Sequence, residues 1–192
     1  MSRQTRALIA FAPRHPLQDA ILQLPRLTPH DLLIRVEACG VCRTDLHIYL
    51  GELTPPQWPV VLGHQIVGQV LETGANADPA LIGTRVGIPW LGSVCGSCRY
   101  CTSHQENLCP HAQFTGFHRY GGFADYVVAD TRFAFPLDPH ADPTHLAPLL
   151  CAGLIAIRPN VTVLPLGRAQ EALTLVEAGA VDGSMVLVPG GD

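Results

Sequence analysis

The sequence predicts a protein made mainly of β-strands with a few helices. Several stretches alternate apolar and polar residues, which is the period of a strand buried on one face. The 18 glycines and 17 prolines are scattered along the chain, as is typical of turns between short strands. With 192 residues, 47% of them hydrophobic, the chain can bury a substantial core as one domain.

The clearest strand is predicted over residues 31–38, where Ile34 and Val36 alternate with Arg35 and Glu37. The same period predicts strands over residues 66–74, 84–90 and 121–130. These strands form a β-rich body whose loops carry the polar chemistry.

Helices are expected in the second half of the chain. A short one is predicted over residues 143–150 with Asp142 as its N-cap. The next opens near Cys151 and stops before Pro159, because proline restricts the preceding residue to extended conformations.

The last helix and the last strand follow each other near the C-terminus. The helix places Ala169, Leu173 and Val176 on one face, and Gly179 is its expected stop. Residues 184–189 then predict a final strand.

Charge gives no support for a nucleic-acid or membrane partner. The chain has 12 Lys and Arg against 16 Asp and Glu, a net charge of -4 without long runs of one sign. The apolar run over residues 7–12 is too short for a signal-peptide core or a membrane span. We therefore expect a soluble, cytoplasmic protein.

The strongest chemical signal is a loop with four cysteines. Seven cysteines without an export signal favour metal over disulfides. Four thiolates that converge tetrahedrally suit zinc and leave no open position, which indicates a structural site. Four reduced cysteines on an ordinary loop are the alternative. The proposed ligands are Cys95, Cys98, Cys101 and Cys109, and the remaining histidines nearest to them are His104 and His111.

A second set of potential ligands is dispersed along the chain. Alone, each has a simpler explanation, because a single cysteine is usually a small buried residue and a single histidine is often only hydrogen-bonded. Together, Cys42, His64 and Cys151 would form a Cys2His set with a fourth position open, which is the arrangement expected of a catalytic zinc.

Five motifs occur in one recognisable order: "GVCRTDLH", "GHQ", the four-cysteine loop, "GGFADY" and "PLLCAG". In these motifs the sequence resembles the zinc-containing alcohol dehydrogenases of the medium-chain dehydrogenase/reductase family. The resemblance covers residues 7–157 and implies a GroES-like β-barrel catalytic domain.

The resemblance also implies roles for single residues. The catalytic zinc would be bound by Cys42, His64 and Cys151. Thr44 would hydrogen-bond the substrate oxygen, and His47 would pass its proton outward.

Other roles concern the coenzyme and the surroundings of the metal. Arg43 lies where the family contacts the coenzyme pyrophosphate, and Asp45 would fix the ring of His64. Gln65 departs from the Glu of many members, which removes a negative charge beside the metal. Cys39 is expected to be a buried structural residue.

The domain boundaries follow from the same resemblance. Residues 1–157 form the GroES-like domain, with the structural-zinc lobe at about residues 92–112. Residues 158–192 resemble the family's C-terminal segment, which completes the same domain. They contain no GxGxxG, so the NAD(P)-binding Rossmann domain is expected to be absent.

We therefore expect an isolated catalytic domain with two zinc ions per chain and a small alcohol or aldehyde as zinc ligand. NAD(P) is the coenzyme of the family, but it should bind poorly here and allow no efficient turnover. A weak zinc-dependent hydrolase and a non-catalytic metal-stabilised scaffold are the alternatives.

We expect that the Rossmann domain was removed by truncation or engineering and that residues 158–160 close the gap. This removal would leave apolar side chains uncovered, namely Leu149, Leu150, Leu154, Ile155 and Ile157. A patch of this kind is rarely left exposed by soluble monomers. We expect a homodimer, or repacking under Val163, Leu164 and Leu166.

Overall fold

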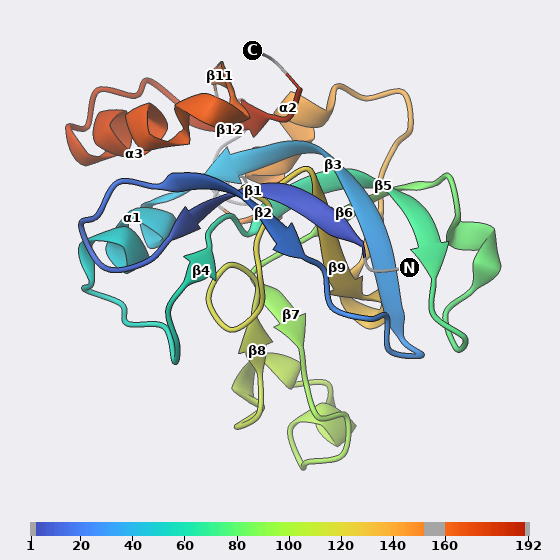
Figure 1. Cartoon of the computed structure of the whole chain (residues 1–192). Coiled ribbons are helices and arrows are strands. Elements are labelled where there is room, and N and C mark those ends of the chain that lie inside the picture. The colour runs from blue at the N-terminus through green and yellow to red at the C-terminus, as the bar shows by residue number, and fades with distance from the viewer. Residues whose placement is uncertain (1–2, 152–159, 191–192) are drawn as a thin grey trace.

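The computed structural model describes residues 3–151 and 160–190, and it confirms a mainly β protein with a few helices (Figure 1). The strands are β1 (Gln4–Ala10), β2 (Gln18–Gln23), β3 (Asp31–Val41), β4 (Val60–Val61), β5 (Gln65–Thr73), β6 (Arg85–Ile88), β7 (Leu91–Ser93), β8 (Gln113–Phe114), β9 (Tyr126–Asp130), β10 (Phe135–Pro136), β11 (Val161–Pro165) and β12 (Ser184–Val188). The α-helices are α1 (Arg43–Leu50), α2 (Pro143–Leu146) and α3 (Ala169–Glu177).

Strand β3 is the centre of the larger sheet because it is paired along both edges. Its partner on one edge is β5, while β9 pairs with its first half and β12 with its last residues, all antiparallel. The sheet has the order β10-β6-β5-β3-β12-β11, with β9 added on β3. The C-terminal end of β3 therefore lies deep in the sheet, immediately before Cys42.

A smaller sheet of order β2-β1-β4 packs with the larger one. Ile9 of β1 and Ile34 of β3 are fully buried in the same apolar core. The segment before β9 connects the two sheets, since Leu8 N donates to Phe123 O at 2.9 Å. The two sheets thus enclose one barrel-like core.

A small lobe projects from this barrel between β7 and β8 (Figure 1). It contains two turns of 3-10 helix, Cys101–Ser103 and Glu106–Leu108. In the part of the chain that the structure describes, the buried apolar residues at its base are only Val94, Cys109 and Phe133. A lobe with so small a core needs an additional constraint to keep its shape.

The last elements add to the larger sheet. Strand β12 runs parallel to β11 and antiparallel to β3, with Met185 opposite Val41 and Leu187 opposite Cys39. Helix α3 lies between them in the chain and packs near α1, with Leu173 fully buried.

The four predicted strands before the helices all form, with different ends for most. The largest difference is the strand predicted over residues 121–130, of which only β9 is formed. The reason is the close packing of a glycine pair that precedes it. A Cβ on Gly121 would lie 2.2 Å from Gly63 O, so this stretch packs as irregular backbone against the chain beside it.

The helix predicted over residues 143–150 is divided into α2 and a 3-10 turn, Ala147–Leu150. Pro148 favours this change, because it lacks the N–H of an α-helical turn. The N-cap is confirmed, since Asp142 Oδ1 accepts from Thr144 N at 2.8 Å. Helix α3 is also confirmed, and Gly179 follows it with a φ of 65°.

The helix expected after Cys151 lies outside the described residues, as do Leu154, Ile155 and Ile157 of the expected apolar patch. Within the described residues, Leu149 and Val163 are exposed, whereas Leu164 and Leu166 are buried. Leu164 and Leu166 pack into the main apolar core, and Leu150 packs in a separate small cluster with Ala147 and Val186. The expected covering of the patch therefore stays a prediction.

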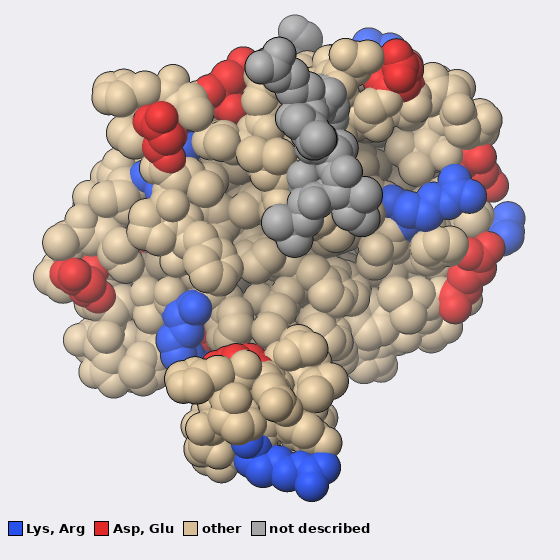
Figure 2. Space-filling model, turned by 180° about the vertical axis from the view of Figure 1, so that it is seen from behind, with Lys and Arg blue, Asp and Glu red and all other residues tan. Residues whose placement is uncertain are grey.

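Seen from behind, the charged side chains of the described residues are dispersed and form no broad patch of one sign (Figure 2). None of the helices in residues 3–151 and 160–190 has the length and hydrophobicity needed to cross a membrane.

Candidate metal centres

Cys42 lies at the junction between β3 and α1. Its backbone is extended, with φ -121° and ψ 163°, and it is the N-cap of the helix. Asp45 Oδ2 accepts a hydrogen bond from Cys42 N at 2.9 Å, which satisfies a backbone donor that the start of a helix leaves free. The sulfur of Cys42 is therefore held at a defined position.

The carboxylate of Asp45 connects this junction to the loop before β5. It is fully buried, and its Oδ1 accepts from Gly63 N at 2.9 Å and contacts His64 Nδ1 at 3.2 Å. A carboxylate at Nδ1 places the proton of a neutral imidazole on that nitrogen. In the neutral ring, which is the form that binds metal, Nε2 then carries a free lone pair. Burial alone would lower the pKa of His64, but the charge of Asp45 raises it well above the ordinary value, so a bound metal ion displaces a proton from Nε2.

The His64 ring presents this lone pair to two cysteines. One ligand atom from each of Cys42, His64 and Cys151 lies within 4.8 Å of the others. Among the described residues, His64 Nε2 is the one buried side-chain nitrogen or oxygen without a hydrogen-bond partner. A buried polar atom without a partner is costly, so the set fits a thiophilic metal ion such as zinc.

The two sulfurs compete for one proton. A hydrogen bond from Cys151 lowers the pKa of Cys42 to about 4, and the same contact raises the pKa of Cys151 to about 12. One of the two cysteines is therefore a thiolate at neutral pH, which is the form that binds metal.

Three residues of α1 that the sequence singled out lie beside this cluster or near it. Thr44 Oγ1 lies 3.9 Å from the sulfur of Cys42. His47 is half exposed, and its Nδ1 is hydrogen-bonded to the carboxylate of Glu52. Arg43 donates to Val176 O at 3.2 Å, so it contacts the C-terminal turn of α3.

Gln65 and Cys39 are both buried. Gln65 packs directly over β3, where Gly40 makes room for it: a Cβ on Gly40 would lie 1.9 Å from Gln65 Oε1. Burial raises the pKa of the Cys39 thiol, which therefore stays protonated. Cys39 belongs to neither cluster in the described residues.

An aromatic wall next to His64 was missed by the sequence reasoning. The Trp90 ring meets the His64 ring edge-on at 5.1 Å and stacks on Phe114 at 4.9 Å. Phe117 lies 5.9 Å from Trp90. Trp90 ends a predicted strand, and nothing in that pattern indicates which cluster its ring would face.

The four cysteines of the lobe form the second cluster. Their ligand atoms also lie within 4.8 Å of one another, with sulfur–sulfur distances of 3.5 Å for Cys98 to Cys101 and 3.6 Å for Cys109 to Cys95. Backbone N–H groups, foremost that of Ser97, lower the pKa of Cys95 to about 6. The cluster fits a closed tetrahedral metal site.

The two nearby histidines are both exposed on this lobe. The backbone N–H of His111 donates to Cys109 Sγ at 3.4 Å, and His104 has a φ of 57° in a turn. The described metal cluster contains only the cysteines.

The chain matches the family described as alcohol dehydrogenase GroES-like domain over residues 28–139. The probable alcohol dehydrogenase AdhA of Mycobacterium tuberculosis (strain CDC 1551 / Oshkosh) is 43% identical over 158 residues, which are 79% of this chain and 46% of the relative. This chain spans about half the length of the curated relatives it matches.

Solved structures agree with this match. A putative zinc-binding dehydrogenase from Sinorhizobium meliloti 1021, bound to NADP, has a TM-score of 0.69 at 33% identity, covering 94% of this chain and 54% of its own. AibC has a TM-score of 0.85 and covers 98% of this chain and 96% of its own, but at 17% identity it shows the fold alone. The GroES-like fold expected from the motifs is confirmed.

Proposed function

Since this chain belongs to the alcohol dehydrogenase GroES-like domain family, we propose that it is the zinc-binding catalytic domain for NAD(P)-dependent oxidation of an alcohol to an aldehyde or ketone. The observation that supports this most is the convergence of Cys42, His64 and Cys151, with a buried His64 Nε2 that has no hydrogen-bond partner.

Two zinc ions per chain follow from the two clusters. The four cysteines of the lobe would hold a structural ion, and Cys42, His64 and Cys151 would hold the catalytic one. Bound to two thiolates and an imidazole, the catalytic ion would supply Lewis-acid chemistry and a free coordination position.

The residues of α1 would handle the substrate and its proton. Thr44, next to the sulfur of Cys42, would accept and pass on the proton of the substrate hydroxyl. His47 lies one turn further along the same helix face and is half exposed, so it can carry that proton to solvent. The rings of Trp90 and Phe117 would form an apolar wall for the substrate carbon chain.

Coenzyme positioning sets the limit on turnover by this chain alone. Hydride transfer from the alcohol needs NAD(P) held against the reacting carbon, and good positioning is equivalent to effective molarities of up to about 10⁵–10⁸ M. Because the sequence has no GxGxxG, we propose that the 192-residue chain oxidises alcohols negligibly with either coenzyme.

Metal analysis of site variants tests the proposed centres. The chain prepared with zinc should contain two ions, and Cys42→Ser or His64→Gln should remove one of them. Cys39→Ala is the matched control, since this buried cysteine lies three residues before Cys42 but outside both clusters, and the variant should retain two ions.

A folded chain with unchanged zinc content in Cys42→Ser would overturn the catalytic centre. A coenzyme titration with alcohol tests the turnover proposal separately. Saturable NAD(P)-dependent turnover that is lost in Cys42→Ser would contradict it. Ester hydrolysis that depends on Cys42 would instead favour the hydrolytic alternative.

A further inference from the structure

Two buried carboxylates face each other at one end of the β3–β9 pair. Asp31 and Asp130 are directly opposite in the antiparallel register, and each carboxylate is only 7% exposed. Like charges at opposite positions of a strand pair are destabilising, and a buried charge needs a partner. Each carboxylate has its own arginine: Arg119 donates to Asp31 at 3.2 Å, and Arg132 binds Asp130.

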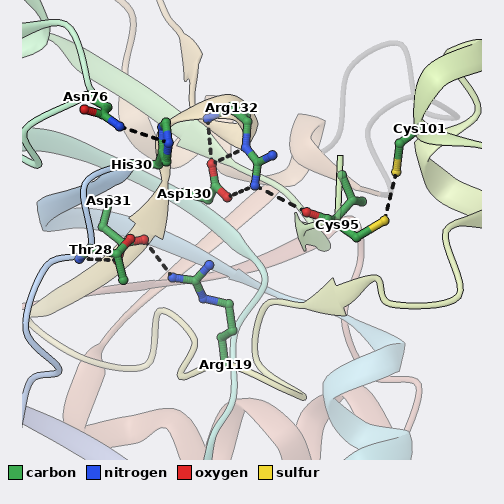
Figure 3. A network of polar contacts seen from close by, with 10 residues as sticks. Thr28, His30, Asp31, Asn76, Cys95, Cys101, Arg119, Asp130 and Arg132 are labelled. Carbon is green, nitrogen blue, oxygen red and sulfur yellow. Dashed lines mark hydrogen bonds and ion pairs between the residues drawn. The ribbon is translucent and has the colours of Figure 1, made fainter. Parts of the chain in front are cut away.

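The two arginines differ in what else they contact. Arg132 uses both Nε and Nη2 on Asp130, at 3.0 and 2.6 Å, and its Nη2 also donates to Val94 O at 3.3 Å (Figure 3). Val94 is the residue before Cys95 and is buried at the base of the lobe together with Cys109. The side chain of Arg119 makes its hydrogen bond to the barrel, at Asp31.

Arg132 also places a positive charge near Cys95 and Cys101 of the four-cysteine cluster. Its Nη1 packs on the backbone at Gly96, where an added Cβ would lie 3.2 Å from it. The hydrogen bond to Asp130 raises the pKa of Arg132 most, and the charges of Cys101 and Cys95 contribute to the same shift. Four thiolates around one divalent ion carry a net charge of about -2, which a nearby cation offsets.

We propose that Arg132, held by Asp130, positions the four-cysteine lobe on the barrel and offsets its negative charge, so that metal affinity of the lobe depends on this residue. The inference rests on the proposed structural zinc site. Groups around a metal that orient its ligands commonly change metal affinity by about 10–100-fold when they are removed.

The experiment uses two matched double variants of the 192-residue chain. Asp130→Asn/Arg132→Gln neutralises the pair that reaches the lobe and leaves no unpaired buried charge. Asp31→Asn/Arg119→Gln is the control, because it neutralises the neighbouring ion pair, which bonds within the barrel. Zinc affinity is measured by competition with a chromogenic chelator, and backbone hydrogen exchange is measured over residues 92–112.

The first variant should lose about tenfold or more in affinity at the four-cysteine site and exchange faster over residues 92–112. The control should stay within about twofold of the wild type on the same scale. If the first variant does not fold, Arg132→Lys replaces it. Lysine retains the positive charge but cannot bond Asp130 and Val94 O at the same time, as the guanidinium does. An intermediate loss of zinc affinity is then expected.

Equal affinities in wild type and in the folded variants at Arg132 would overturn this inference while leaving the zinc site in place. A wild-type chain that binds no zinc at Cys95, Cys98, Cys101 and Cys109 would instead remove the proposed site itself. The two failures are therefore distinguishable in one titration.

Discussion

Replacing Asp45 by Asn keeps the shape of the side chain and removes its charge. Asp45 Oδ1 accepts two hydrogen bonds, from Gly63 N and His64 Nδ1, whereas Oδ2 accepts one, from Cys42 N. The amide oxygen of Asn should therefore take the Oδ1 position. The amide NH2 then faces the N–H of Cys42, and that donor is left without an acceptor.

The expected destabilisation follows from these three bonds. A hydrogen bond to a charged group contributes about 1.5–3 kcal/mol and a neutral one about 0.5–1.5 kcal/mol. Losing one charged acceptor and weakening two others amounts to about 3–5 kcal/mol. This loss is a large part of the free energy of unfolding of a native protein, which is about 5–15 kcal/mol. The His64 ring also loses its fixed orientation, so zinc affinity at Cys42 should fall by about 10–100-fold.

Urea denaturation of the metal-free protein measures the loss in free energy of unfolding. Competition with a chelator measures the loss in zinc affinity. Asp31→Asn is the control, because Asp31 is also buried but lies at the opposite end of β3. It should lower stability and leave zinc affinity at the Cys42 site unchanged. A loss below about 1 kcal/mol together with wild-type zinc affinity would refute the role derived for Asp45.

Three further outcomes are expected. Gly40→Ala should destabilise the protein by about 1–3 kcal/mol in denaturation experiments, because the new Cβ would lie 1.9 Å from Gln65 Oε1, whereas Gly167→Ala, with its nearest neighbour at 3.9 Å, should be tolerated. Burial alone would raise the pKa of Asp130, but hydrogen bonds from its arginine partner lower it. The stability advantage of wild type over Asp130→Asn should therefore be complete above about pH 5 and disappear as the pH falls below about 4, as denaturation across a pH series will show. Chelation should accelerate hydrogen exchange over residues 92–112 before it affects the sheets; simultaneous loss of protection would contradict a metal-dependent lobe.

The residues of both clusters could be found in the sequence because the chemistry restricts their types and spacing. Cys95 to Cys109 lie in one loop, so their spacing alone indicates a shared site. Cys42, His64 and Cys151 are far apart in sequence, and there the motif resemblance was required. Their actual convergence depends on the pairing of β3 and β5, which no local pattern specifies.

Helix α1 could not be predicted from local signals, although its residues were singled out one by one. Its N-cap is a cysteine instead of Ser, Thr, Asp or Asn, and its eight residues include β-branched Thr44 and Ile48. The Asp45 side chain caps the helix at Cys42 N, and its bond to Gly63 N attaches the helix to the loop before β5. The formation of α1, whose own helix propensity is low, therefore depends partly on a tertiary contact.

Glycine contacts explain why the alternation of apolar and polar residues predicted the strand over residues 121–130 too long. Gly121 and Gly122 pack so closely against Gly63 and Ile66 that side chains would not fit. The alternation in residues 121–130 reports burial correctly, but it cannot distinguish a paired strand from extended backbone packed against its neighbour.

The pairing of β12 with the last residues of β3 has a consequence for biosynthesis. Residues 39–41, which lead directly to Cys42, pair with a strand that is synthesised about three quarters of the chain length later. During translation, Cys42 therefore emerges long before β12, which is one of the two strands that flank the end of β3. We expect the four-cysteine lobe, whose ligands are local, to take up metal on the nascent chain. The dispersed site should acquire its ion only after β12 has left the ribosome.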